Sequence, residues 1–212
     1  MAYQYFLLDN LLSLKAMKAI ILLATLKKEG LSNTEVLSEF FAEQLQKNQI
    51  EYEIIKLVDH NILPGTYSDM GEGDDWPAIL EKIKSSEIII FSTPVWWGVH
   101  SSEMQKVVER LDHIHDEILE GEKSQLDGKV AGIIITGDSD GAEQIIGNIS
   151  NFLNAIGVIL PPYATLSVLW EGQAKNVKTT RPQLMKKYMD DYTQTADLMA
   201  KQILKYAGLI KE

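Results

Sequence analysis

The chain has 212 residues, of which 45% are hydrophobic and 24% are charged, a composition typical of one soluble domain that builds its own hydrophobic core. It contains no cysteine, which excludes disulfides, thiolate metal sites, cysteine-ligated iron–sulfur clusters and a cysteine nucleophile, and suits a reducing cytoplasm. The formal net charge of −10 opposes nonspecific binding to phosphate backbones, so we expect no nucleic-acid partner.

Residues 1–16 form an N-terminal extension that differs from the rest of the chain. The segment is partly apolar, but Asp9 and Asn10 interrupt the apolar run and no basic cluster precedes it. It therefore lacks the features of a signal peptide and is too short to span a membrane. Two interpretations stay open: an amphipathic arm that docks on the body, or a start codon assigned too early. We expect the folded domain to cover residues 17–212, without a membrane partner.

From residue 17 onward, short β-rich apolar runs alternate with amphipathic helical patterns. The predicted strands cover residues 19–24, 52–57, 88–91, 130–135 and 158–168. Strands that are apolar on both sides are typical of a parallel sheet with both faces covered. The alternation predicts a doubly wound α/β fold. Pro161 and Pro162 place the fifth strand at an edge of the sheet or break it.

Helical patterns fill the intervals between these strands. Capping signatures are formed by Ser32 with Glu35, Ser102 with Gln105, and Asp140 with Glu143. Apolar residues between Met104 and Ile118 predict one continuous helix. Further helices are expected near residues 77–84 and 182–208. The long connection over residues 60–76 is either a lid or partner-facing loop, or a solvated insertion.

Ligands of doubly wound sheets bind beyond the carboxyl ends of the strands, which directs attention to three loops. The first, residues 25–34, offers hydroxyls, Gly30 and two lysines. Backbone N–H groups at the following helix, with the hydroxyls of Ser32 and Thr34, suit a phosphate. The alternative is that Ser32 only caps the helix. The glycine spacing of a Walker loop or of a dinucleotide fold is absent.

The second loop, residues 93–102, places Trp96 and Trp97 beside Pro94 and Gly98 at the end of a buried strand. Exposed aromatic residues there suit a flat aromatic ligand. Alternatively, one tryptophan covers the sheet end or sits in a dimer contact.

The third loop, residues 136–141, has glycines that allow close backbone approach to a ligand. The alternative is a tight turn with Asp140 as helix cap. Asp138 and Asp140 have no further carboxylates close in sequence, so we expect no metal. No nucleophile-elbow spacing occurs, and we assign no catalytic residue.

Several segments together resemble the flavodoxin-like NADPH-dependent FMN reductase family. They are SNTE at 32–35, TPVWWG at 93–98 followed by two serines, RLD at 110–112 and GDSDG at 137–141. GEGDDWP at 71–77 is similar to the flavodoxin branch. The first loop departs from the compact loop of small flavodoxins. The resemblance covers residues 17–210 and implies a flavodoxin-like five-stranded parallel sheet in the order 2-1-3-4-5, with helices on both faces.

The resemblance also implies FMN as cofactor and NAD(P)H as co-substrate. It places the FMN phosphate in the first loop, with Lys27 as an ion-pair donor, the isoalloxazine along the second loop, and the third loop on the other side of the ring. The residues so assigned are Thr25, Lys27, Ser32, Asn33, Thr34, Pro94, Val95, Trp96, Trp97, Gly98, Gly137, Asp138 and Gly141.

We expect an NAD(P)H-dependent oxidoreductase that passes electrons through FMN to a quinone, a flavin or another acceptor. One alternative is a flavodoxin-type electron carrier without NAD(P)H oxidase activity, for which the acidic balance suits basic partners. Another is a flavin-free interaction protein on the same fold.

We also expect a homodimer that shares its flavin site between subunits. The reason for this expectation is a surplus of aromatic residues at one end of the sheet, namely Trp96, Trp97, Tyr163 and Trp170. A monomer seldom leaves so much apolar surface exposed beside a cofactor. The alternative is that Trp170 packs inside its own subunit.

Overall fold

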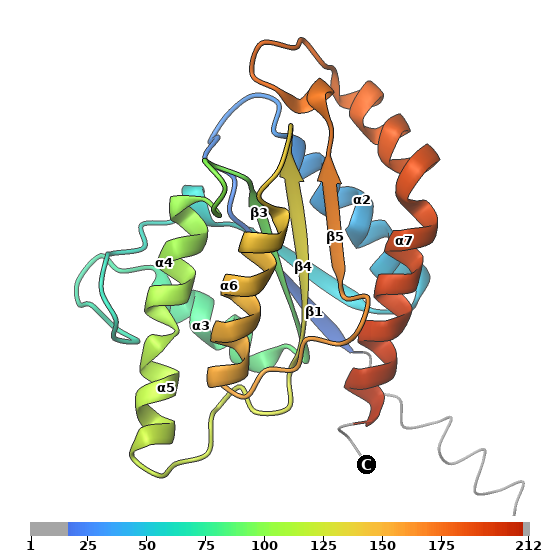
Figure 1. The fold of residues 1–212 in the computed structure, drawn as a ribbon. Helices are drawn as coiled ribbons and strands as arrows, with labels where there is room; N and C mark the ends of the chain where they lie inside the picture. Colours follow the sequence, from blue (N-terminus) through green and yellow to red (C-terminus); the bar gives the residue numbers. More distant parts are fainter. Residues whose placement is uncertain (1–16, 210–212) are drawn as a thin grey trace, which may run out of the picture.

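The computed structural model describes residues 17–209 (Figure 1), so the predicted extension 1–16 lies outside the described residues. In chain order the elements are β1 (Lys18–Leu23), α2 (Asn33–Lys47), β2 (Glu51–Lys56), η1 (Leu57–Asp59), α3 (Trp76–Ser85), β3 (Ile88–Pro94), α4 (Ser102–Arg110), α5 (Asp112–Leu119), β4 (Val130–Gly137), α6 (Ala142–Ala155), β5 (Thr165–Leu169), η2 (Glu171–Gln173) and α7 (Arg181–Leu209). The first four strands and the helices near residues 77–84 and 182–208 agree with the sequence prediction to within a few residues.

Within residues 17–209 the strands form a five-stranded sheet in the order β2-β1-β3-β4-β5, and each neighbouring pair is parallel. This confirms the predicted doubly wound fold. The strand order reverses between β1 and β3, where Ile20 pairs with Ile89. Ligands of such sheets bind beyond the carboxyl ends of the strands at this switch point, so the topology identifies the edge where a site belongs.

Helices cover both faces of the sheet (Figure 1): α3, α4, α5 and α6 pack on one face, and α2 and α7 on the other. Successive side chains of a strand point to opposite faces. In β1, Ile20 and Leu22 contribute to the first core, whereas Ala19 and Ile21 contribute to the second. This alternation of buried apolar residues explains why the strand sequences are apolar throughout.

Two of the three predicted helix caps are wrong. Ser32 caps α2 as expected, because its Oγ accepts from Glu35 N. The cap of α4, however, is Ser101 and not Ser102, and its Oγ accepts from Met104 N at 3.3 Å. The N-cap of α6 is Gly141, with φ +108° and no side-chain cap bond, so the expected cap at Asp140 does not form.

The predicted continuous helix over residues 104–118 is divided into α4 and α5. Leu111 separates the two helices, and Ile114 N donates to Leu111 O at 3.0 Å. This hydrogen bond joins residues three positions apart, as in a 3₁₀-helix, whose turn is tighter than that of an α-helix. Because the break is only one residue long, Val107, Leu111 and Ile114 still lie in the same core.

The fifth strand begins later than the sequence predicts. β5 starts at Thr165, and Ile159 makes only an isolated bridge to Val130. Pro161 and Pro162 lie between them and cannot donate to a ladder, so they break the predicted strand. As a consequence Tyr163 precedes β5 and lies at the amino edge of the sheet. The expectation that it joins the tryptophans at the carboxyl edge is wrong.

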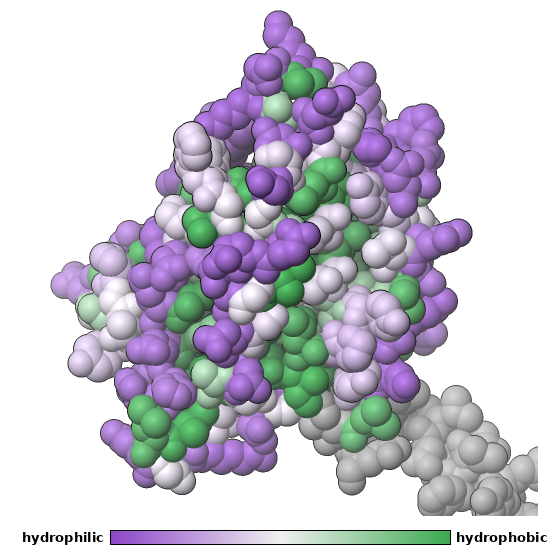
Figure 2. Space-filling view, in the orientation of Figure 1, coloured by the Kyte–Doolittle hydropathy of each residue, from purple (hydrophilic) through white to green (hydrophobic). Residues whose placement is uncertain are grey.

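Hydrophilic side chains dominate the face shown in Figure 2, and apolar residues form small separate groups there. No helix between residues 17 and 209 combines the length and hydropathy that crossing a membrane requires.

Candidate functional site

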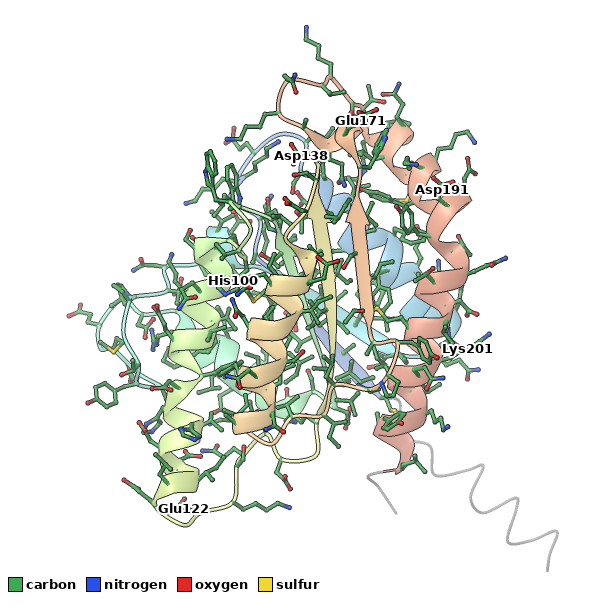
Figure 3. The ribbon with its side chains drawn as sticks, viewed as in Figure 1. His100, Glu122, Asp138, Glu171, Asp191 and Lys201 are labelled. Atoms are coloured by element: carbon green, nitrogen blue, oxygen red, sulfur yellow. The ribbon has the colours of Figure 1, made fainter. Side chains whose placement is uncertain are left out.

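The predicted site residues all lie at or just beyond three strand ends. Thr25, Lys27, Ser32, Asn33 and Thr34 follow β1; Pro94, Val95, Trp96, Trp97 and Gly98 end or follow β3; Gly137, Asp138 and Gly141 end or follow β4. Main-chain bonds hold these ends together: Ala24 N donates to Ser92 O, and Val95 N donates to Thr136 O, each at 2.8 Å. The structure thus brings the three loops to the carboxyl edge, where Figure 3 labels Asp138.

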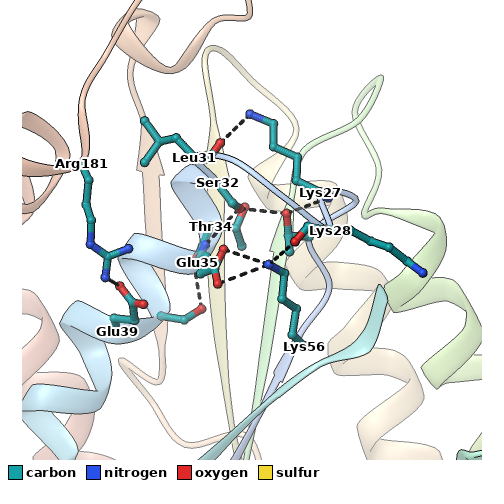
Figure 4. A network of polar contacts seen from close by, with 11 residues as sticks. Lys27, Lys28, Leu31, Ser32, Thr34, Glu35, Glu39, Lys56 and Arg181 are labelled. Atoms are coloured by element: carbon teal, nitrogen blue, oxygen red, sulfur yellow. Dashed lines mark hydrogen bonds and ion pairs between the residues drawn. The ribbon is translucent and has the colours of Figure 1, made fainter. Parts of the chain in front are cut away.

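The first loop is held by its own hydroxyl groups (Figure 4). Ser32 Oγ accepts from Glu35 N at 3.2 Å and donates to Thr25 Oγ1 at 2.8 Å. Thr34 Oγ1 lies 2.6 Å from Thr136 Oγ1 at the end of β4. Thr25, Ser32 and Thr34 are all buried. Ser32 is therefore a helix cap, and Thr34 fastens the helix to the sheet.

Several donors of the first loop remain unused by these bonds. The amide groups of Asn33 and Thr34 lie in the first turn of α2, where a helix has no acceptor for its own N–H groups. Thr25 Oγ1 accepts from both Ser32 Oγ and Lys27 N, so its proton is free for a ligand. A helix N-terminus with spare hydroxyl protons favours an anion. The donor set fits a phosphate group.

Lys27 was predicted to form an ion pair with that phosphate. Its Nζ donates to Leu31 O at 2.6 Å, across the loop, and its side chain is exposed. Lys56 supports the same loop from β2, because its Nζ donates to Lys28 O at 3.0 Å and pairs with Glu35 at 3.3 Å. Both lysines therefore stabilise the loop itself, and an ion pair from Lys27 stays a prediction.

The second loop contains a tight turn over residues 96–99. Trp96 N donates to Val99 O at 2.7 Å, and Val99 N donates to Trp96 O at 3.0 Å. Trp97 has φ +51° and Gly98 has φ +79°, the pattern of a type I′ turn. A tryptophan in this region is strained. The turn presents Trp97 outward, and this residue is 98% exposed.

Trp96 differs from its neighbour because it is half-buried. Its indole Nε1 is buried and has no hydrogen-bond partner among residues 17–209. The Lys175 ammonium lies 4.2 Å from the centre of the ring, a cation–π contact that reaches across from the loop after β5. A buried indole donor without a partner is costly, which indicates a place for an acceptor on a ligand.

The third loop packs directly on the second. A Cβ atom added to Gly141 would lie 2.8 Å from Gly98 Cα and 3.0 Å from Val95 Cγ1. Gly137 is similarly close to Val95. These two glycines are therefore required by the contact between the loops, and by the positive φ of Gly141. Asp138 is exposed beside them.

A fourth loop lies between β5 and α7; its Trp170 was noted in the sequence, but Gln173 was missed. Gln173 Nε2 donates to Gly137 O at 2.9 Å, and Asn33 Nδ2 donates to Gln173 O at 3.3 Å. Tyr188 of α7 contacts the same group through its hydroxyl. No motif marks Gln173, and Tyr188 has the spacing of an ordinary core residue. Only the aromatic Trp170 drew attention to this loop.

Ser101 also stabilises the carboxyl edge of the sheet. Its Oγ donates to Ala24 O at 2.7 Å, and its N–H donates to Thr93 Oγ1 at 3.1 Å. It thereby joins the ends of β1 and β3 to the start of α4. The serine pair at 101–102 signalled this position, although the cap was placed one residue late.

The fold is that of a flavodoxin-like α/β protein, and its carboxyl edge offers donors that suit a flavin phosphate. The free donors at the start of α2 fit the phosphate, and the unpaired Trp96 Nε1 fits a polar atom of the ring system. The chain belongs to the NADPH-dependent FMN reductase family, whose model matches residues 17–169. This confirms the expected family and FMN as the cofactor.

Two curated relatives match about three quarters of the chain. The chain is 33% identical over 171 residues to 8-demethyl-8-aminoriboflavin-5'-phosphate synthase of Streptomyces davaonensis, covering 75% of this chain and 65% of that protein. It is 31% identical over 163 residues to the divalent metal cation transporter MntH of Mycobacterium bovis, covering 74% of this chain. The chain spans 65% and 24% of the lengths of these two relatives.

A solved structure supports the fold. The crystal structure of RosB with a bound intermediate, 8-demethyl-8-formylriboflavin-5'-phosphate, has a TM-score of 0.74 to this chain, with 24% sequence identity. The match covers 92% of this chain and 81% of that one. At this identity the likeness shows the flavodoxin-like architecture alone.

Proposed function

We propose that the protein is an FMN-dependent NAD(P)H oxidoreductase that passes electrons to a quinone, a free flavin or another small acceptor. The bound FMN would supply the redox chemistry, taking a hydride from NAD(P)H, which leaves as NAD(P)⁺, and passing two electrons on. The residues of the chain would bind FMN, orient it and shield it from solvent. We place the protein in the cytoplasm, a reducing compartment with which a chain without cysteine is compatible, and cell fractionation tests this location.

One observation carries the proposal. A donor-rich helix N-terminus meets the Trp96–Val99 turn at a single edge of the sheet, within the residues that the family model matches. The first-turn amides of α2 would hold the phosphate, because they have no acceptor of their own. Trp96 would donate to the ring system from a buried position. Gly141 lets the third loop come close to the second.

The first experiment identifies the chromophore. The purified protein should absorb near ~450 nm, as flavins do, and the flavin released on denaturation should be FMN. The reason is that the first loop offers a phosphate-sized donor set and lacks the glycine spacing that holds a pyrophosphate. FAD as the main species would overturn the cofactor assignment.

The second experiment separates an enzyme from an electron carrier. Steady-state oxidation of NADH and NADPH is followed with a quinone or ferricyanide as acceptor. Turnover supports the oxidoreductase. A yellow protein that does not oxidise either nucleotide, yet exchanges electrons with a basic redox protein, would be a carrier, for which the net charge of −10 is suited.

A second candidate function takes the flavin phosphate as substrate instead of cofactor. The relative from Streptomyces davaonensis is named as a synthase of an aminoriboflavin phosphate, and the same edge of the sheet would serve such a substrate. Mass spectrometry of the flavin before and after turnover distinguishes the two. Unchanged FMN supports the oxidoreductase, and a flavin of altered mass supports the synthase.

A further inference from the structure

Gln173 contacts two of the loops that the proposed FMN site uses. Its Nε2 donates to the carbonyl oxygens of Gly137 at 2.9 Å and Val168 at 2.8 Å. Its Oε1 accepts from the hydroxyl of Tyr188 at 3.0 Å. Its main-chain carbonyl accepts from Asn33 Nδ2 at 3.3 Å. Every polar atom of the side chain is thus used, and the amide has only one orientation that satisfies all of these partners.

Tyr188 extends this network to the main chain of the first loop. Its hydroxyl lies 3.3 Å from Asn33 O as well as 3.0 Å from Gln173 Oε1. Burial of the side chain, with a smaller effect of Tyr192, raises the pKa of the phenol, so the hydroxyl remains a donor. The ring packs beside Phe40 at 6.1 Å between centroids, which holds the hydroxyl in place.

We infer that Gln173 is a positioning residue that holds the phosphate-binding turn of α2 at a set distance from the ring-side loop after β4. The inference rests on the proposed function, because it assigns the phosphate of FMN to the first loop. The path runs from Gly137 O through the Gln173 amide and the Tyr188 hydroxyl to Asn33. Gln173 and Tyr188 lie after residue 169, beyond the segment that the family model matches.

This arrangement affects one part of the ligand more than the other. The first-turn amides of Asn33 and Thr34 are the donors for the phosphate, and the network fixes the position of Asn33. The Trp96–Val99 turn, which would contact the ring system, is instead closed by its own hydrogen bonds. Loss of the network should therefore weaken the binding of a flavin that carries a phosphate more than the binding of one that does not.

The test compares FMN with riboflavin, which lacks the phosphate. Apo-protein is titrated with each flavin for the wild type, Gln173→Met, Tyr188→Phe and the double variant. Gln173→Met keeps the length of the side chain and removes its hydrogen bonds, while Tyr188→Phe removes only the hydroxyl. Gln144→Met is the matched control, because Gln144 is exposed on α6 and bonds only to Asn148. Urea unfolding is measured for each protein.

We expect Gln173→Met to weaken FMN binding about tenfold and riboflavin binding clearly less. Tyr188→Phe should act in the same direction, and the double variant should lose less than the sum, since both residues belong to one network. Equal losses for the two flavins, or a loss of stability with unchanged affinities, would overturn the inference and leave Gln173 with a purely structural role. A wild type that binds neither flavin would refute the proposed function, and the inference with it.

Discussion

The Asp74 carboxylate and the Arg110 guanidinium form an ion pair in which neither side chain is exposed to solvent. Nη2 lies 2.6 Å from Oδ2, and Nη1 lies 3.1 Å from Oδ1. Arg110 also donates to the carbonyl oxygens of Leu63 and Tyr67, and it lies over the ring of Trp76. The pair joins two segments that carried the family resemblance separately, and it anchors the long connection over residues 60–76 to α4.

Removal of the Asp74 carboxylate should strongly destabilise the fold. Asp74→Ala leaves the buried Arg110 charge without a partner, and such a loss costs about 3–5 kcal/mol in the free energy of unfolding. Urea titration measures the change. Glu81→Ala is the control, since it removes an ion pair to Lys84 in which the glutamate is largely exposed, and we expect a change of about 0–1 kcal/mol. Similar losses in both variants would contradict the assigned role of the buried pair.

The same ion pair predicts a dependence of stability on pH. Burial alone would raise the pKa of Asp74, but hydrogen bonds from Arg110 and from the main-chain N–H groups of Met70, Trp76 and Leu63 outweigh it and lower the pKa to about 2. A carboxyl whose pKa is depressed by folding stabilises the protein above its ordinary pKa of 3.8. This stability is lost as the pH falls from about 4 to about 2.

Urea unfolding across this pH range tests the effect. Asp74→Asn should show a flatter dependence than the wild type between about pH 4 and pH 2, because the titrating group is gone. An identical slope in the two proteins would mean that other carboxyl groups dominate acid unfolding.

Replacement of Ser32 and Thr34 together by alanine should weaken FMN binding. Ser32→Ala removes a helix cap worth about 1 kcal/mol of stability together with the bond to Thr25, and Thr34→Ala removes the bond to Thr136. The first-turn amides that would hold the phosphate then lose their fixed position, and hydrogen bonds to a charged group contribute roughly 1.5–3 kcal/mol each. Titration of apo-protein with FMN and urea unfolding measure the two effects. Ser150→Ala on α6, whose hydroxyl bonds only within its helix, serves as control. Unchanged FMN affinity in the double variant would place the phosphate elsewhere.

Gly141→Ala should disturb the contact between the second and third loops. The added methyl group would meet Gly98 Cα at 2.8 Å, and the φ angle of residue 141 is +108°. The free energy of unfolding should therefore fall by more than about 1 kcal/mol, on the order of the cost of a strained backbone position. FMN should also bind more weakly. Gly147→Ala is the matched control, because nothing lies within 4 Å of its added methyl group. In the interior of α6 it should stabilise by about 0.5–1 kcal/mol. Thermal unfolding with and without FMN compares the two variants. Equal changes in stability for Gly141→Ala and Gly147→Ala would contradict the prediction.

Trp97→Asn tests the proposed homodimer. Asparagine tolerates positive φ better than tryptophan, so this change should relieve strain of about 1 kcal/mol and stabilise the fold. If Trp97 contacts a second subunit, the same change should convert a dimer of about twice the 23.8 kDa chain mass into a monomer, as measured by light scattering. A stabilised fold with a weakened assembly is the expected combination.

Tyr163→Asn provides the control for this experiment. Tyr163 also has a positive φ, +64°, and is 68% exposed, but it lies at the opposite edge of the sheet. It should gain similar stability and keep the oligomeric state of the wild type. A wild type that is monomeric at micromolar concentration would refute the shared site and leave the tryptophans as part of a pocket in one chain.

The sequence by itself determined the features that depend on neighbouring residues. Apolar runs identified the first four strands, and the spacing of Ser32 and Glu35 identified the start of α2. Because consecutive parallel strands need crossovers, these elements also indicated a doubly wound parallel sheet, whose ligand edge lies at the carboxyl ends of the strands. The strand order came from the family resemblance. The short motifs of those loops were sufficient to recognise the family.

The tertiary structure decided the features that depend on distant contacts. Asp74 and Arg110 lie 36 residues apart, and Asn33 and Gln173 lie 140 apart. No local periodicity encodes such pairs, since each forms only when two separate segments of the chain pack against each other. The start of β5 and the position of Tyr163 followed from which main-chain groups could join the sheet. The exposure of Trp97 was decided by the backbone of one turn, because its φ angles direct the side chain away from the core.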